Sequence, residues 1–134
     1  MQKPKAMNPK RILVIDDNVG LTQMIKLNLE ATGHYEVCIE NDSTKSVETA
    51  RRFRPDVILL DYVMPEVDGG DITLNLRADP FLSSIPVIMV TALVSNKEMG
   101  PDGTVFRGGQ VMLAKPVNLE NLLRCIEKHL MSAA

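Results

Sequence analysis

The chain has 134 residues, of which 45% are hydrophobic and 24% are charged, a composition typical of a single soluble globular domain. Its formal net charge at pH 7 is -2, and no basic stripe follows the first eleven residues. Sequence-independent binding to nucleic acid requires many lysines and arginines on one face, so this class of function is disfavoured.

The cellular compartment follows from what the sequence lacks. The basic N-terminal segment has no apolar stretch of the kind found in signal peptides, and the longest apolar runs are far too short to span a bilayer. Cys38 and Cys125 match no metal or redox spacing, and we interpret both as thiols near the core. We therefore expect a cytoplasmic protein that binds neither membrane nor nucleic acid.

Short apolar runs, and one alternating run at 35–40, predict strands, and these are interleaved along the chain with segments of helical spacing. In chain order we predict a strand at 11–15, a helix ending at Gly33, a strand at 35–40, a helix from an N-cap at Ser43 to about Arg54, a strand at 56–60, a helix at 71–78 stopped by Pro80, strands at 85–90 and 110–114, and a last helix capped by Asn118. This alternation predicts an α/β fold with a parallel sheet covered on both faces.

One stretch breaks the alternation. Between the last two predicted strands, where a helix is due, the segment 93–109 contains Pro101 and several glycines. These residues are unfavourable in a helix interior. We expect the helix of this segment to be shortened or replaced by a loop.

Four of the predicted strands end in polar residues: Asp16 and Asp17, Asp61, Thr91, and Lys115. In open parallel sheets, ligands bind at the carboxyl ends of the strands, so these side chains should meet. Three crowded carboxylates repel one another unless a cation such as Mg²⁺ relieves them. A hydroxyl and an ammonium nearby suit phosphoryl oxygens. The chemistry that this set permits is attack by a carboxylate on an activated phosphorus, forming an aspartyl phosphate.

From about Lys10 to Leu130 the chain resembles a response-regulator receiver domain of two-component signalling, similar to single-domain chemotaxis regulators. The resemblance rests on motifs in order at strand ends: Asp16-Asp17, Asp61-Tyr62-Val63-Met64-Pro65 with Asp68-Gly69, Thr91-Ala92 and Lys115-Pro116. It implies a doubly wound, five-stranded parallel sheet of flavodoxin-like order 2-1-3-4-5. The receiver domain would span 10–131, between a flexible segment 1–9 and a tail 132–134.

The resemblance also implies a role for each motif residue, and Mg²⁺ as the cofactor. The implied roles are phosphoacceptor for Asp61, main metal ligand for Asp17, water-mediated metal ligand for Asp16, metal ligand through its backbone carbonyl for Val63, hydrogen-bond donor to the phosphoryl group for Thr91, ion-pair partner of that group for Lys115, and a cis peptide bond before Pro116.

The implied function is a phosphorylation-dependent switch, charged by a sensor histidine kinase or a histidine phosphotransfer protein. No output domain follows in this sequence, so we expect the switch to act through a partner protein or a phosphorelay. We expect no enzymatic activity beyond self-phosphorylation and slow self-dephosphorylation. The resemblance implies that positions 63 and 93 flank the route of the hydrolytic water, and Val63 and Leu93 are apolar and cannot orient it.

Met112 departs from the family pattern, which has Tyr or Phe at this switch position, so the usual coupling to an output surface is in question. The alternative is a non-phosphorylated interaction module of receiver fold. A phosphatase is disfavoured because Val63 stands where such enzymes carry an acid/base Asp, and a Rossmann dehydrogenase because no glycine-rich turn follows the first strand. Three arginines, at 51, 52 and 54, are interpreted as a solvated helix face rather than a docking patch.

Overall fold

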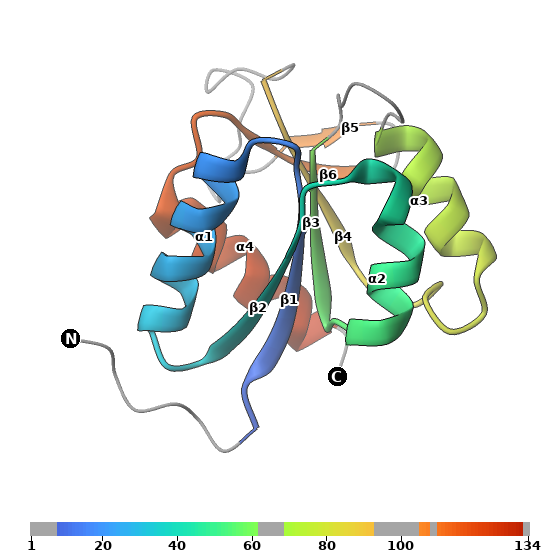
Figure 1. The fold of residues 1–134 in the computed structure, drawn as a ribbon. Helices are drawn as coiled ribbons and strands as arrows, with labels where there is room; N and C mark the ends of the chain where they lie inside the picture. The colour runs from blue at the N-terminus through green and yellow to red at the C-terminus, as the bar shows by residue number, and fades with distance from the viewer. Residues whose placement is uncertain (1–7, 62–68, 93–104, 108–109, 133–134) are drawn as a thin grey trace.

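The computed structural model describes residues 8–61, 69–92, 105–107 and 110–132 (Figure 1). Its elements are β1 (Lys10–Ile15), α1 (Val19–Ala31), β2 (Tyr35–Glu40), a 3₁₀ turn η1 (Ser43–Lys45), α2 (Ser46–Phe53), β3 (Val57–Asp61), α3 (Gly69–Ala78), β4 (Val87–Thr91), β5 (Val105–Arg107), β6 (Gln110–Ala114) and α4 (Leu119–Ser132). The predicted flexible N-terminal segment lies largely outside the described residues.

The strands form one sheet of order β2-β1-β3-β4-β6-β5. All pairs from β2 to β6 are parallel, which confirms the predicted five-stranded parallel sheet of order 2-1-3-4-5, with β6 as its fifth strand. β5 is an addition that the sequence analysis did not predict, and it pairs antiparallel with β6 at the sheet edge. The sequence does carry a hairpin signal there, because Gly108-Gly109 separates two apolar runs.

The stretch that interrupts the alternation is therefore part strand. Residues 105–107 form β5, where a loop or a shortened helix was expected. The remainder of the predicted loop, 93–104 and 108–109, lies outside the described residues. The shortened helix therefore stays a prediction.

Helices cover both faces of the sheet, with α1 and α4 on one face and α2 and α3 on the other (Figure 1). Successive strand residues point to opposite faces. Accordingly, Ile12 and Val14 pack in the cluster beneath α1 and α4, while Leu13 and Ile15 pack beneath α2 and α3. Burial on both faces explains why the inner strands β1, β3 and β4 read as nearly continuous apolar runs, whereas the edge strand β2 alternates.

Local signals set most helix ends. Gly33, with φ 81°, follows the C-cap of α1, as predicted, and the Asn118 side chain accepts a hydrogen bond from the backbone N–H of Asn121 at 3.0 Å. The N-cap predicted at Ser43 is wrong. Asp42 caps the 3₁₀ turn η1 that precedes α2, since its carboxylate accepts hydrogen bonds from both the backbone and the hydroxyl of Thr44; α2 itself begins after Lys45, which makes no side-chain cap.

Among the described residues, no helix has the combined length and apolar character that crossing a bilayer requires.

Candidate phosphoryl and metal site

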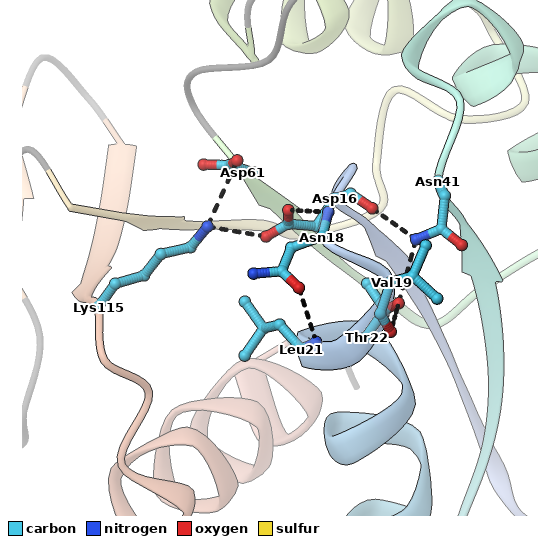
Figure 2. Close-up of polar contacts among 8 residues, drawn as sticks. All are labelled: Asp16, Asn18, Val19, Leu21, Thr22, Asn41, Asp61 and Lys115. Carbon is cyan, nitrogen blue, oxygen red and sulfur yellow. Dashed lines mark hydrogen bonds and ion pairs between the residues drawn. The ribbon is translucent and has the colours of Figure 1, made fainter.

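The predicted site residues meet at one edge of the sheet. Asp16 and Asp17 follow β1, Asp61 ends β3, Thr91 ends β4 and Lys115 follows β6. Because these strands are parallel neighbours, their carboxyl ends lie side by side, and Asp16, Asp61 and Lys115 point toward one another (Figure 2). The structure thus brings together five residues from four strand ends.

Three of these residues form a carboxylate cluster. Asp16, Asp17 and Asp61 each offer an oxygen, and these oxygens all lie within 4.8 Å of one another. Asp16 and Asp61 are only 4% and 6% exposed, whereas Asp17 is open to solvent. Like charges this close repel, and burial removes the water that would screen them. The donor set, hard oxygens with one solvent-facing ligand, fits Mg²⁺, which keeps several waters.

Lys115 supplies the positive charge of the site. Its Nζ lies 2.9 Å from Asp16 Oδ2 and 3.4 Å from Asp61 Oδ2. Burial lowers the pKa of Lys115, but the hydrogen bond to Asp16 and the charges of Asp16 and Asp61 outweigh it, and the pKa stands above its ordinary value. The side chain is therefore a permanent cation between two carboxylates.

A backbone hydrogen bond fixes the position from which the Lys115 side chain extends. The N–H of Lys115 donates to the carbonyl of Thr91 at 2.9 Å, which ties the end of β6 to the end of β4. The Lys115–Pro116 peptide bond is cis, the isomer that the resemblance implied. Thr91 itself is 1% exposed.

A second set of contacts holds Asp16 in place. Asp16 Oδ1 accepts a hydrogen bond from the N–H of Asn18 at 3.0 Å, and its carbonyl accepts one from Asn41 Nδ2 at 2.7 Å (Figure 2). The same Asn41 nitrogen donates to Thr22 Oγ1 at 3.1 Å. Asp16 is thus held by the loop to α1 and by the end of β2.

Asn18 and Asn41 are parts of this site that were not predicted from the sequence. Asn41 directly follows β2, the one parallel strand whose end was not considered. Asn18 is also the N-cap of α1, where its side chain accepts from the N–H of Leu21 at 3.0 Å. Both signals, a polar residue at a strand end and an N-cap, were present in the sequence.

Three further predicted positions lie elsewhere or outside the described residues. Met112 is buried in the cluster beneath α2 and α3, together with Met89 and Ala114. Val63, predicted to offer its carbonyl to the metal, and Leu93, predicted to flank the hydrolytic water, are not among the described residues.

Residues 12–127 match the response regulator receiver domain family, and the chain belongs to this family. Protein PilH of Pseudomonas aeruginosa is 40% identical over 118 residues, which cover 87% of this chain and 93% of PilH. The polar-differentiation response regulator DivK of Brucella anthropi is 32% identical over 91% of this chain and 97% of its own length. The transcriptional regulator RpaA of Synechocystis sp. is 37% identical, and the chain spans 46% of its length.

Solved structures agree with this assignment. The chemotaxis response regulator CheY4 of Vibrio cholerae is similar with a TM-score of 0.74 and 26% identity, over 91% of this chain and 99% of that one. The receiver domain of Francisella response regulator 1452 gives a TM-score of 0.76 and 26% identity over 95% and 100%. Receiver domains are phosphorylation-dependent switches of two-component signalling that bind Mg²⁺ at an acidic pocket and have kinase or phosphotransfer partners.

Proposed function

We propose that this chain accepts a phosphoryl group on Asp61 from a phosphohistidine of a sensor histidine kinase or of a histidine phosphotransfer protein. The observation that carries the proposal is the position of Lys115 Nζ, 2.9 Å from Asp16 and 3.4 Å from Asp61, beside three carboxylates whose oxygens lie within 4.8 Å. One edge of the sheet therefore offers a nucleophile, a cation for phosphoryl oxygens and oxygen ligands for a metal.

In the proposed reaction a carboxylate oxygen of Asp61 attacks the phosphorus atom of the donor. The new O–P bond forms as the P–N bond to the imidazole breaks, and the imidazole nitrogen leaves with the electron pair. Charge spreads over the three remaining phosphoryl oxygens in the transition state. Lys115 would pair with one of these oxygens and the hydroxyl of Thr91 would donate to another.

The metal would be held by Asp16, Asp17 and Asp61, with the backbone carbonyl of Val63 as a further ligand. When bound, Mg²⁺ supplies positive charge that offsets the charge on the phosphoryl oxygens. Asp16 would act largely through a water molecule. The hydrogen bonds from Asn18 and Asn41 support this role because they fix the position of Asp16, whose carboxylate oxygens can each accept a further hydrogen bond.

The output step is proposed to run through binding of a partner protein or through relay of the phosphoryl group. Met112 would take the switch position that is aromatic in the family. Its burial beneath α2 and α3 supports a packing role there, since a flexible thioether fills space without a ring or hydroxyl. The phosphorylated form would hydrolyse slowly, because Val63 and Leu93 are apolar.

Incubation with acetyl phosphate and Mg²⁺, followed by intact-mass measurement, tests phosphoryl acceptance. We expect the mass of one phosphoryl group on the wild type and none on Asp61→Asn. Asp71→Asn, which changes an exposed carboxylate on α3, is the matched control and should be phosphorylated like the wild type. An unmodified wild type, or a modified Asp61→Asn, would contradict the proposal and favour the non-phosphorylated interaction module.

A further inference from the structure

A cavity of about 600 Å³ lies at the opposite end of the sheet from the carboxylate cluster, where β3 and β4 begin. It is lined by residues from the end of α2 and from the connection between α3 and β4: Arg51, Arg54, Pro55, Pro80, Phe81, Leu82 and Ile85. We call this the Arg54 cavity. Its volume falls within the range of roughly 300–1,000 Å³ that is typical of ligand pockets.

Asp79 builds the cavity by joining its two walls. Its carboxylate, 2% exposed, forms an ion pair with Arg51 Nε on α2 and accepts a hydrogen bond from the N–H of Phe81 at 2.8 Å. Its carbonyl accepts from the N–H groups of Leu82 at 3.0 Å and Ser83 at 2.9 Å. The walls are therefore held in place before any ligand arrives, which lowers the entropic cost of binding.

The cavity is lined mainly by apolar side chains and carries a net positive charge. Pro55, Leu82 and Ile85 provide the apolar surface, and Phe81, 82% exposed, extends that surface outward. Asp79 balances the charge of Arg51. Within the part of the chain that the structure describes, the Arg54 side chain forms no ion pair or hydrogen bond.

The backbone of Arg54 adds an independent observation. Arg54 is the C-cap of α2 and adopts the left-handed conformation, with φ 55° and ψ 65°. Glycine or asparagine is favoured at such a position, because a longer side chain is strained there. The backbone conformation therefore does not explain why residue 54 is an arginine. A role in ligand binding explains it, because the guanidinium lines an apolar cavity.

We propose that the Arg54 cavity is a docking site for an acidic peptide segment of a partner protein, one that places an apolar side chain beside a carboxylate. The apolar side chain would fill the space between Pro55, Leu82 and Ile85, and the carboxylate would pair with Arg54. The exposed ring of Phe81 favours an extended peptide over a small molecule, because it offers apolar contact beyond the cavity. Two arginines on a chain of net charge -2 are too few for a membrane surface or nucleic acid.

The test uses the unphosphorylated full chain, so its outcome is separate from phosphoryl acceptance by Asp61. ¹⁵N-labelled protein is titrated with nine-residue peptides that carry a central Leu, Ile or Phe between Asp and Glu residues. A second set has Asn and Gln in place of Asp and Glu. We expect the acidic set to shift the amide resonances of Phe81, Leu82 and Ile85, and the neutral set to bind about tenfold more weakly, the loss of one charge-assisted hydrogen bond.

Matched variants locate the charge and the apolar contact. Affinity for the tightest acidic peptide, followed by fluorescence anisotropy, should fall about tenfold in Arg54→Gln and stay within about twofold in Arg52→Gln. Arg52 is exposed on the same helix but does not line the cavity. Phe81→Ser should also weaken binding, whereas Leu74→Ser, on the exposed face of α3, should not.

Several outcomes would overturn the proposal. These are no acidic peptide binding below millimolar concentration, equal binding of the neutral set, resonance shifts away from 80–85, and equal loss in Arg52→Gln. The proposal would also be wrong if phosphatidylserine vesicles or single-stranded DNA bound through Arg54, or if benzylsuccinate bound more tightly than every peptide.

Discussion

Each end of the parallel sheet contains an ion pair with a buried aspartate, and the two ends differ in the net charge of the side chains around that pair. At the carboxyl end, the buried Asp16 pairs with Lys115 across β1 and β6; at the amino end, the buried Asp79 pairs with Arg51 across the α3–β4 connection and α2. In both places an aspartate with little solvent exposure joins elements that are distant in the sequence. Removing one partner of such a pair leaves an uncompensated buried charge.

The surplus beyond each pair is opposite in sign. At the carboxyl end Asp17 and Asp61 add two carboxylates, so the edge is suited to a cation. At the amino end, the Asp79 carboxylate already accepts from the Phe81 N–H and from Arg51, and Arg54 adds a cation. A buried ion pair by itself is structural. The net charge of the side chains around each pair indicates what class of ligand that end can bind.

The largest expected effect is a loss of phosphorylation at the carboxyl end that leaves peptide binding at the amino end nearly unchanged. Asp61→Asn should abolish phosphoryl incorporation from acetyl phosphate, because the nucleophile is lost. Its affinity for the acidic peptide should stay within about twofold of the wild type, since no charge near the Arg54 cavity changes. Intact mass and anisotropy on the same preparation measure both. Loss of peptide affinity in this variant would show that the two ends are coupled.

Lys115→Ala should change two properties of the carboxyl end in opposite directions. Phosphorylation should slow by about 10²-fold, the usual cost of losing one donor to a developing charge. Affinity for Mg²⁺ should rise about tenfold, because the ammonium competes for Asp16 and Asp61. Isothermal titration calorimetry measures the second effect. A weaker affinity for Mg²⁺ would mean that Lys115 organises the carboxylates rather than repelling the metal.

Asp79→Asn should lower the urea midpoint at neutral pH. The hydrogen bond from the Phe81 N–H lowers the pKa of Asp79, burial opposes it, and Arg51 lowers it further, so the folded-state pKa lies below its ordinary value of 3.8. The stabilisation is therefore present above the ordinary pKa and is lost as the pH falls through the lowered one.

Urea midpoints measured from pH 7 down to pH 2 should show the wild type and Asp79→Asn converging in acid. The control Glu127→Gln, at an exposed position of α4, should differ little from the wild type at neutral pH. A constant gap between Asp79→Asn and the wild type at every pH would show that shape, and not charge, makes Asp79 important to the cavity walls.

The smallest predicted effect is a change in stability, with opposite signs for Arg54→Gly and Arg52→Gly. Arg54→Gly should stabilise the chain by about 1 kcal/mol, because glycine adopts the left-handed conformation without strain. Arg52→Gly should destabilise it by about 1 kcal/mol, since Arg52 lies within α2. Urea unfolding measures both. If Arg54→Gly gains stability and loses affinity for the acidic peptide, Arg54 contributes to binding rather than to folding.

Much of the fold could be predicted because the central strands β3 and β4 are buried on both faces and therefore read as apolar runs. The run Val57–Asp61 shows this directly, with four apolar residues followed by a carboxylate. Asp42 was missed as a cap because Ser43, a residue of similar preference, stands next to it. β5 was missed because three residues are too few to give a periodic pattern.

The sequence by itself determined the order of the five parallel strands' apolar runs and the polar residues that end four of them, because these are local properties of strand periodicity and burial. Only the tertiary structure decided which distant residues meet. Asn41 reaches Asp16 because β2 lies beside β1, and Arg51 meets Asp79, 28 residues away, because α2 and α3 cover the same face. Such contacts depend on how the sheet is ordered, which no window of the sequence contains.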